Sequence, residues 1–407
     1  MKILLCFGTR PEAIKMAPLY HAFCQSELVE DQSALQYCHT EPVEVQHDKV
    51  ENQKNSFEVK VCVTAQHRKM LDQVLDFFEI TPDYDLDLMT TNQSLNILGS
   101  RILEKIDNIL IEAKPDWVLV HGDTTTSVMV ALAAFHQGIK VGHVEAGLRT
   151  YNKQAPFPEE VNRQLTSRIA DLHFAPTEEA LENLRKEGVA NDTIFKVGNT
   201  IVDALQWALY KMNKGYQNDE ILKWENQLDK SKKLILVTGH RRENFGEGFL
   251  NLCEALSELS KRKDVEIVYP VHLNPKVQEP VYKSLSNQNN IHLIPPAEYP
   301  IFIWLMQRAA LIISDSGGIQ EEAPTLGIPV LVTREITERA EGIDKGFSIL
   351  VGTDKVKIVN EANKILDHFK GFDKLENPYG DGKASERIVE ILGKKNALSR
   401  CTSTGSV

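Results

Sequence analysis

Three acidic residues stand where carboxylates could exchange protons with a bound substrate. Asp123 ends the apolar run of VLVHGDTTT, Glu145 ends that of GHVEAGLRT, and Glu159 follows in PFPEEVNR. Carboxylates at the ends of neighbouring strands can be held in different environments, and acid/base catalysis requires groups whose pKa values differ. The three are therefore candidate catalytic residues. Two have a structural alternative, because Asp123 before a run of threonines is a good helix N-cap and Glu159 after Pro158 could complement a helix dipole.

A second group of residues is basic and suits an anion. In FGTRPEAIKMAP a strand gives way to a helix, so Arg10 lies beside the helix N-terminus and the side chain of Lys15 points back toward it. Two cations together with free amide groups suit a phosphate. The alternative is a strand–helix junction with two solvated basic residues. In VTGHRREN the set His240, Arg241 and Arg242 also follows a strand, and we expect an anion site there.

Paired glycines mark a third motif, IISDSGGIQEEAP. Gly317 and Gly318 permit close backbone approach, so their amides at a helix N-terminus could hold a diphosphate while Ser316 adds a hydroxyl donor. Glu322 could reach ribose hydroxyls. The alternative is ordinary capping, with Asp315 or Ser316 as N-cap and the acidic pair of the motif in the first turn. Capping does not need two glycines, so we favour a ligand.

The elements that must position these motifs alternate along the chain. Short apolar runs such as KILLCFG, PDWVLVHGD, KKLILVTGH and ALIISDSGG predict strands, and amphipathic stretches such as LNILGSRILEKIDNILIEA predict the helices between them. This alternation stops at a polar stretch near 211–233 and then resumes. We expect an α/β fold with two Rossmann-like doubly wound domains facing across a cleft, with ligand at the carboxyl ends of the strands. The predicted parts are an N-terminal domain over 1–205, a C-terminal domain over 206–395 and a flexible tail over 396–407.

One polar segment, from about 24 to 56, lacks any sustained period. The preceding helix and the following strand make a complete unit without it. We therefore interpret it as a loosely packed surface insert, and because long surface insertions cost little closure entropy we expect its removal to leave a folded protein.

Length and composition bound the class of protein. A chain of 407 residues with 42% hydrophobic and 25% charged residues has enough apolar side chain for two cores. The net charge of -11 disfavours nucleic-acid and anionic-membrane partners. The apolar start MKILLCFG is too short for a signal-peptide core, and no apolar run reaches the length of a membrane span. We expect a cytoplasmic protein without a nucleic-acid or membrane partner.

The sequence also predicts chemistry without a cofactor or metal. The six cysteines are scattered without a C-x-x-C pair, which argues against a disulfide framework or a zinc site. No G-x-G-x-x-G follows any strand, and no G-x-x-x-x-G-K-[ST] occurs, so dinucleotide and P-loop fingerprints are missing.

The motifs together resemble a known family. GTRPEAIKMAP, TAQHRKMLDQVL, VHGDTTT, VEAGLRT, PFPEEVNR, VTGHRREN, YPVHLNP and SDSGGIQEEAP are similar in order and spacing to those of bacterial non-hydrolysing UDP-N-acetylglucosamine 2-epimerases. The resemblance covers nearly the whole chain apart from the insert and the tail. It implies a glycosyltransferase-B-like fold, a homodimer, and reversible epimerisation at C2 of UDP-N-acetylglucosamine (UDP-GlcNAc) to UDP-N-acetylmannosamine (UDP-ManNAc). It further implies elimination of UDP and re-addition through 2-acetamidoglucal, in the synthesis of surface polysaccharide precursors.

The resemblance also assigns roles residue by residue. It implies that the acid/base set is Asp123, Glu145 and Glu159, with His240 as a catalytic residue on the phosphate side. The substrate ligands that it implies are Arg10, Lys15, Asp123, Glu145, His240, Phe302, Ser316, Gly317, Gly318, Glu322 and Arg339, with Phe302 beside the uracil. Ala297 stands where relatives can present a glutamine near the base, so we expect backbone contact to the uracil there.

A second molecule of UDP-GlcNAc acts as an activator in related bacterial enzymes. Matches to that site are Gln66, Gln93, Glu159, Arg241 and His272. Lys69 and Asn92 depart from it, since relatives can carry Gln and Arg there, so we expect allosteric activation with weaker coupling.

Three other functions stay open at this stage. A glycosyltransferase of the same fold would need an acceptor groove and would not need three carboxylates. A non-catalytic sensor of UDP-sugars would keep the anion-binding residues and could lose the carboxylates, all of which are present. Relatives that act on other 2-acetamido sugars would share every motif named above.

Overall fold

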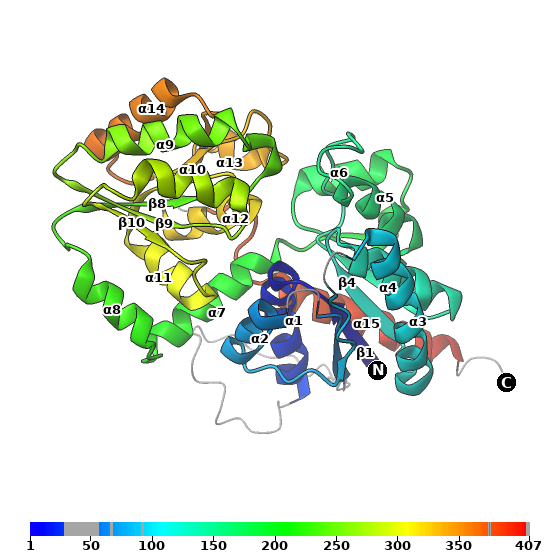
Figure 1. The fold of residues 1–407 in the computed structure, drawn as a ribbon. Helices are drawn as coiled ribbons and strands as arrows, with labels where there is room; N and C mark the ends of the chain where they lie inside the picture. The colour runs from blue at the N-terminus through cyan, green and yellow to red at the C-terminus, as the bar shows by residue number, and fades with distance from the viewer. Residues whose placement is uncertain (28–56, 66–67, 91–92, 373, 375, 404–407) are drawn as a thin grey trace. The chain divides into compact units, whose positions relative to one another are not determined.

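Figure 1 shows the fold of the chain in a computed structural model, which describes residues 1–27, 57–65, 68–90, 93–372, 374 and 376–403. The chain divides into two compact units. Unit 1 comprises Met1–Thr200 and Lys383–Val407, and unit 2 comprises Ile201–Gly382. Most of the insert expected over 24–56 lies outside the described residues, and its first residues, 24–27, belong to a helix.

Unit 1 is a doubly wound α/β unit. Its described residues form a parallel seven-stranded sheet in the order β3-β2-β1-β4-β5-β6-β7. The strands are β1 (Lys2–Phe7), β2 (Glu58–Val63), β3 (Tyr84–Asp85), β4 (Trp117–His121), β5 (Lys140–Val144), β6 (Leu172–Ala175) and β7 (Ile194–Lys196). The helices are α1 (Arg10–Glu27), α2 (Arg68–Phe77), α3 (Leu95–Ala113), α4 (Thr125–His136), α5 (Glu159–Ile169), α6 (Glu178–Lys186) and α15 (Ala384–Ser403).

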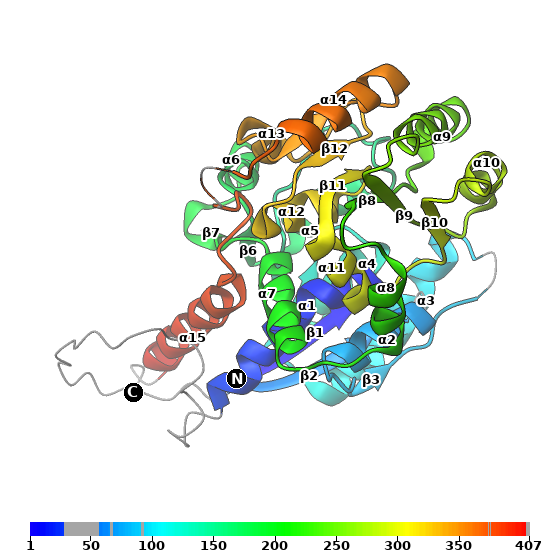
Figure 2. The same ribbon diagram turned by 90° about the vertical axis from the view of Figure 1, so that its left-hand side faces the viewer.

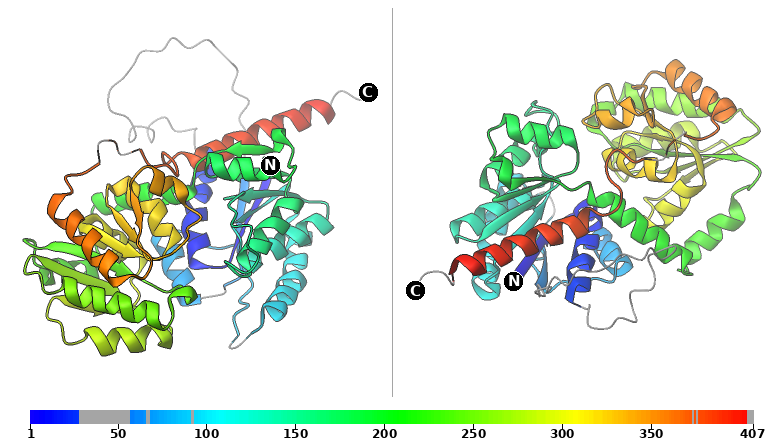
Figure 3. Two further views of the ribbon diagram at one scale, coloured as in Figure 1. Left: turned by 90° about the horizontal axis from the view of Figure 1, so that it is seen from above. Right: turned by 180° about the vertical axis from the view of Figure 1, so that it is seen from behind.

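Unit 2 repeats this architecture. Its described residues form a parallel six-stranded sheet in the order β10-β9-β8-β11-β12-β13. The strands are β8 (Lys233–Thr238), β9 (Val265–Pro270), β10 (Ile291–Ile294), β11 (Ala309–Ser314), β12 (Val330–Val332) and β13 (Ser348–Leu350). The helices are α7 (Thr200–Asn213), α8 (Asp219–Gln227), α9 (Glu247–Leu259), α10 (Pro275–Leu285), α11 (Tyr299–Arg308), α12 (Gly317–Leu326), α13 (Ala340–Asp344) and α14 (Lys355–His368). Helices α9, α10 and α14 cover one face of the sheet, where α9 contacts both of the others (Figure 3).

The expected α/β fold with two doubly wound units is confirmed. The apolar runs form strands because parallel strands covered by helices on both faces must be apolar throughout. The central strand β4 is buried at every position, and residues 3–7 of β1 are buried as well. Apolar residues of α3 and α4 pack on one face of this sheet together with Leu4, Cys6, Val118 and Val120. The strands are held rigidly, so the loops that follow them carry the motifs from fixed positions.

The strand order creates one switch point in each sheet. In unit 1 the order reverses between β1 and β4, and in unit 2 it reverses between β8 and β11. Open parallel sheets bind ligands outside the carboxyl ends of the strands that flank such a point. The FGTRPE and HGDTTT motifs follow β1 and β4, and the GHRREN and SDSGG motifs follow β8 and β11. All four therefore lie where this fold binds ligands.

The C-terminal part of the chain differs from the prediction. Residues 383–395 were expected in the second domain, but they belong to unit 1, where α15 packs against α1 (Figure 2). The expected flexible tail is also wrong over 396–403, because α15 continues to Ser403, while 404–407 lie outside the described residues. Buried apolar residues such as Ile388 and Leu392 hold the helix in place, and such long-range packing overrides a polar local composition. No helix within the described part of the chain is long and apolar enough to span a membrane.

Candidate functional site

The loop between β1 and α1 is closed by the side chain of Glu12. This carboxylate is 2% exposed, and its Oε2 accepts hydrogen bonds from the amides of Gly8 (3.0 Å) and Thr9 (2.8 Å). Burial raises the pKa of Glu12, and the hydrogen bonds that it accepts oppose the rise. The prediction that this loop offers free amides to a phosphate is therefore wrong for these two groups. An anion here would depend on Arg10 and Lys15.

Glu145 lies at the carboxyl end of β5 and forms an ion pair with Lys15. Only 8% of the lysine side chain and 9% of the glutamate side chain are exposed, so solvent screens the pair little. Asn199 donates a hydrogen bond to the same carboxylate oxygen at 2.9 Å, and the imidazole of His121 lies 3.7 Å from it. Glu145 has a φ of 61°, which is uncommon for a residue with a side chain. An unusual backbone conformation that several contacts hold in place is typical of a functional residue.

Asp123 is not the cap of the helix that follows it. The N-cap of α4 is Thr124, whose side chain accepts a hydrogen bond from the amide of Ser127 at 3.1 Å. Asp123 Oδ2 instead lies 2.8 Å from Nε and 2.6 Å from Nη2 of Arg163, and 24% of its side chain is exposed. The capping alternative is thus excluded, and the carboxylate has a cationic partner while it remains accessible.

Glu159 is the first residue of α5 and is half-buried. Its neighbour Glu160 is fully buried and accepts hydrogen bonds from the amides of Thr150 and Tyr151, at 2.9 and 3.1 Å. The structural task at the start of this helix is therefore carried by Glu160. The alternative role of Glu159 in complementing the helix dipole stays compatible with its position.

In unit 2, a buried aspartate joins the two loops at the switch point. Asp315 is fully buried and accepts hydrogen bonds from the amides of His240 (3.0 Å) and Arg241 (2.9 Å) and from the side chain of Asn244 (3.2 Å). It also lies 3.3 Å from Nδ1 of His240. Asp315 therefore anchors the loop after β8. It is not the cap of α12, whose N-cap position is occupied by Ser316 without a side-chain capping bond.

The His240 imidazole combines exposure with a lowered pKa. Partial burial of the ring lowers its pKa, the charge of Asp315 opposes that shift, and the nearby cation of Arg241 adds to it. Because 43% of the side chain is exposed, solvent partly screens these charges. The ring stacks on that of His272, with centroids 5.8 Å apart. A neutral, accessible imidazole has one N–H group, which can donate a hydrogen bond to a phosphate oxygen.

The SGG loop lies against an arginine. An added Cβ on Gly317 would stand 2.4 Å from Cζ of Arg339, whereas on Gly318 its nearest neighbour would be 3.9 Å away. Arg339 is 7% exposed, and its Nη2 lies 2.8 Å from Oε1 of Glu321. The glycine at 317 is therefore needed so that a guanidinium can approach the backbone at the helix start. The capping alternative places Glu321 and Glu322 in the first turn of α12. In the structure they lie beyond that turn.

Three arginines surround a buried carboxylate beside this loop. Arg334 lies 2.8 Å from Glu338, Arg339 forms a second ion pair with it, and Arg241 lies 3.9 Å away. Burial opposes ionisation of Glu338, but the three cations together hold its pKa well below its usual range. Arg334 also pairs with Glu243 and Arg339 with Glu321, whereas Nε of Arg241 is buried without a hydrogen-bond partner. Such a region suits an additional anion.

The residues expected near the nucleoside lie around α11. Phe302 is half-buried in this helix, and Ala297 is 8% exposed in the loop before it. Tyr299 donates a hydrogen bond to Glu322 at 3.0 Å. The structure therefore places Glu322 and Phe302 on adjacent elements of unit 2, since α11 and α12 are in contact.

The residues matched to an activator site are only partly described. Gln66 and Asn92 lie outside the described residues. Gln93 accepts hydrogen bonds from Thr90 and Arg101 in unit 1, at 2.7 and 3.2 Å, whereas Arg241 and His272 belong to unit 2.

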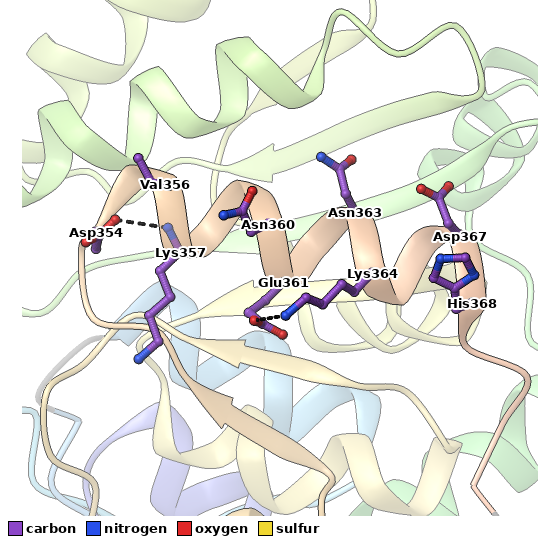
Figure 4. A pocket seen from close by; sticks show the side chains of 9 residues that line it. All are labelled: Asp354, Val356, Lys357, Asn360, Glu361, Asn363, Lys364, Asp367 and His368. Carbon is purple, nitrogen blue, oxygen red and sulfur yellow. Dashed lines mark hydrogen bonds and ion pairs between the residues drawn. The ribbon is translucent and has the colours of Figure 1, made fainter.

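Other candidate sites carry less chemistry. Figure 4 shows a surface hollow along α14, lined by Asp354, Val356, Lys357, Asn360, Glu361, Asn363, Lys364, Asp367 and His368. These side chains come from one helix and its cap, and two of the charged ones already pair with each other, Lys364 with Glu361 at 2.7 Å. Within the described residues, no group of three or more His, Cys, Asp or Glu side chains is placed to hold a metal ion.

Several site residues were missed by the sequence analysis. His121, Arg163, Asn199 and Asp315 all contact predicted site residues, yet none was proposed as a partner. Three of them could have been identified from the sequence, because polar residues at or just after the carboxyl ends of strands are candidate site residues. These three are His121, Asn199 and Asp315. Arg163 had no such signal, since its position within a helix places it on Asp123 only through the tertiary fold.

The chain is similar to known proteins over nearly its whole length. A family model described as UDP-N-acetylglucosamine 2-epimerase matches residues 49–393. The UDP-N-acetylglucosamine 2-epimerase of Escherichia coli (strain K12) is 50% identical over 404 residues, which cover 98% of this chain and 100% of that protein. The crystal structure of the UDP-GlcNAc 2-epimerase from Neisseria meningitidis bound to UDP-GlcNAc is 45% identical, with a TM-score of 0.85, and covers 97% of this chain and 100% of that one. The crystal structure of the UDP-GlcNAc 2-epimerase from Methanocaldococcus jannaschii in complex with UDP-GlcNAc and UDP is 32% identical, with a TM-score of 0.77. The match covers 96% of this chain and 99% of that one.

Proposed function

The chain belongs to the UDP-N-acetylglucosamine 2-epimerase family, and we propose that it interconverts UDP-GlcNAc and UDP-ManNAc. The observation that carries the proposal is a pair of carboxylates in different settings. Glu145 is nearly buried against Lys15, while Asp123 is accessible and held by Arg163. Epimerisation removes a proton from one face of a carbon and delivers one to the other, so it needs two such groups.

The UDP portion binds to unit 2 in this proposal. The amides at the start of α12 and the guanidinium of Arg339 hold the diphosphate, and His240 lies beside them as a hydrogen-bond donor. Glu322 binds the ribose and Phe302 lies beside the uracil. The partnerless Nε of Arg241 supports this location, because a departing UDP carries negative charge that such a cation stabilises.

The reaction starts with cleavage of the bond between C1 and the phosphate oxygen. The C2 proton is weakly acidic because no carbonyl adjoins that carbon, so the C1–O bond breaks ahead of proton removal and its electron pair leaves with UDP. A carboxylate of the set Asp123, Glu145 and Glu159 then takes the C2 proton, and a double bond forms between C1 and C2 to give 2-acetamidoglucal. A second acid delivers a proton to the opposite face of C2 while an oxygen of UDP adds back to C1. No electron is gained or lost overall.

The wider role follows from the product. We propose that UDP-ManNAc made by this chain supplies surface polysaccharide synthesis, that the chain works as a homodimer, and that a second UDP-GlcNAc activates it through Gln93, Arg241 and His272. The similarity to bacterial relatives supports these proposals.

Reaction in deuterium oxide tests the mechanism. Purified protein is incubated with UDP-GlcNAc, without NAD or metal, and the products are examined by mass spectrometry and proton NMR. We expect UDP-ManNAc with one solvent deuterium at C2, because proton return to the opposite face uses an acid that exchanges with water. Full retention of the original hydrogen would overturn the elimination mechanism while leaving epimerase activity established. Absence of UDP-ManNAc would overturn the activity itself.

A further inference from the structure

Glu12 does more than cap its own helix. Thr9, immediately before α1, and Glu12 form a capping box, in which the carboxylate of Glu12 accepts from the amide of Thr9 at 2.8 Å. This accounts for one carboxylate oxygen, Oε2. The other, Oε1, accepts a hydrogen bond from the hydroxyl of Thr124 at 2.7 Å and lies 3.2 Å from the hydroxyl of Ser127.

These two hydroxyls belong to the start of a different helix. Thr124 is the N-cap of α4, and Ser127 is the residue whose amide it caps. One buried carboxylate is thus shared between the first turns of α1 and α4, which follow the two strands at the switch point of unit 1. The positive ends of both helix dipoles converge on it.

The functional residues on each side of this bridge are close in sequence. Lys15 lies one turn beyond Glu12 on α1, and Asp123 immediately precedes Thr124. Any change in the separation of the two helix starts would move the cation that pairs with Glu145 relative to the Asp123 carboxylate. A displacement of about 1 Å in such a constellation can cost on the order of a hundredfold in rate.

We propose that Glu12 is a positioning residue that fixes the start of α1, with Lys15, against the start of α4, with Asp123. An ordinary capping role would affect only the stability of α1, by about 1 kcal/mol. A bridging role links the two helices and changes turnover. The inference rests on the proposed epimerase activity for its kinetic test and has a second test that does not need that activity.

The kinetic test compares matched variants of the full chain. Glu12→Ala removes the hydrogen bonds to the β1–α1 loop and the hydrogen bond to Thr124. Glu12→Gln keeps both sets, because its amide oxygen can accept from the amides of the loop and its amide nitrogen can donate to Thr124. Thr124→Ala removes one N-cap together with the shorter of the two hydrogen bonds that form the bridge, and leaves the contact of Ser127. Thr177→Ala is its control, since Thr177 caps α6 by the same contact, accepting from the amide of Ala180 at 3.2 Å.

The expected pattern separates bridging from capping. We expect Glu12→Ala to lower kcat at least about tenfold with KM changed less than about threefold, since the proposed UDP-binding groups lie in unit 2. Glu12→Gln and Thr177→Ala should stay within about threefold of the parent, and Thr124→Ala should fall between. Equal kcat for Thr124→Ala and Thr177→Ala would refute the bridge. A Glu12→Gln variant as inactive as Glu12→Ala would also refute it, because it would assign a chemical role to the carboxylate.

Hydrogen exchange measured by mass spectrometry gives the second test. In Thr124→Ala we expect faster exchange of the amides of Gly8 and Thr9, which belong to the other loop, and Thr177→Ala should leave them at the parent rate. Unchanged exchange in Thr124→Ala would overturn the inference even if the protein had no epimerase activity. Conversely, coupled exchange in a chain without turnover would leave the bridge standing and remove the proposed function. Both variants keep Glu12, so they avoid the buried unpaired amides that Glu12→Ala creates.

Discussion

Replacing Asp123 by asparagine tests the acid/base assignment directly, because the structure separates catalysis from capping at this position. Thr124 supplies the cap of α4, so the substitution leaves that helix start intact. Asparagine has nearly the same shape and keeps an oxygen that can accept from Arg163. What it removes is the negative charge and the ability to carry a proton.

The effect on stability should be modest. The two contacts to Arg163, at 2.8 and 2.6 Å, change from charge-assisted to neutral acceptors. Hydrogen bonds to charged groups contribute about 1.5–3 kcal/mol and neutral ones about 0.5–1.5, so the loss is about 1–1.5 kcal/mol for each contact and at most about 2–3 kcal/mol in all, since the guanidinium keeps its charge. A domain with a stability of about 5–15 kcal/mol stays folded after such a loss. Unfolding therefore cannot account for a large fall in turnover.

Turnover should fall by a large factor, although the protein stays folded. Loss of an acid/base group costs about a hundredfold or more, which corresponds to about 2.7 kcal/mol in the activation barrier. We expect the same for Glu145→Gln, with UDP binding preserved in both variants. The assay is the initial rate of UDP-ManNAc formation, combined with thermal melting and UDP titration of the same preparations.

Glu187→Gln provides a matched control for the lost ion pair. Glu187 lies 2.7 Å from the buried guanidinium of Arg149 in the same unit, with 15% of its side chain exposed. This variant should lose similar stability and keep its turnover. The assignment fails if Asp123→Asn turns over like the parent, or if Glu187→Gln loses as much activity as Asp123→Asn.

Further predictions concern acid stability, the SGG loop and activation. Burial lowers the pKa of His143 from 6.5 to about 3. Below pH 6.5 the unfolded chain therefore binds a proton that the native chain does not bind, and stability decreases as the pH is lowered. The fall from this residue is about 1.36 kcal/mol per pH unit, or about 2.7 kcal/mol at pH 4.5, and urea unfolding of His143→Gln should show a correspondingly flatter acid limb than the parent. Gly317→Ala should weaken UDP binding more than Gly318→Ala in calorimetry, because only the former places a Cβ against Arg339. With UDP-ManNAc as the starting substrate, trace UDP-GlcNAc should abolish a kinetic lag, and hyperbolic progress without a lag would count against a second site.

The fold was predictable from sequence because its strands are locally encoded. Runs such as LLCF in β1 and WVLVH in β4 are apolar throughout, which is the signature of strands buried on both faces. The short strands β3 and β13 were not predicted. The assignment of α15 to unit 1 was not predicted either, since its packing on α1 joins residues more than 350 positions apart along the chain.

The candidate site was predictable as a set of residue positions but not as a set of contacts. Placement at strand ends identified Asp123, Glu145 and His240. Nothing local indicates that Lys15 pairs with Glu145, because that contact joins helix α1 to the loop after β5, which lies two strands from β1 in the sheet. The same limit made the β1–α1 loop appear to have free amides.

Both units solve one physical problem in the same way. The loops after the two strands at a switch point leave backbone amides without partners in the sheet, and buried amides need hydrogen-bond acceptors. In unit 1 the carboxylate of Glu12, in the first turn of α1, binds the amides of Gly8 and Thr9 and reaches Thr124 after β4. In unit 2 the carboxylate of Asp315, from the second loop, reaches the amides of His240 and Arg241 in the first. A motif acid at a strand end can therefore serve as an internal anchor, and its accessibility separates the two roles: Glu12 and Asp315 are at most 2% exposed, whereas the Asp123 side chain is 24% exposed.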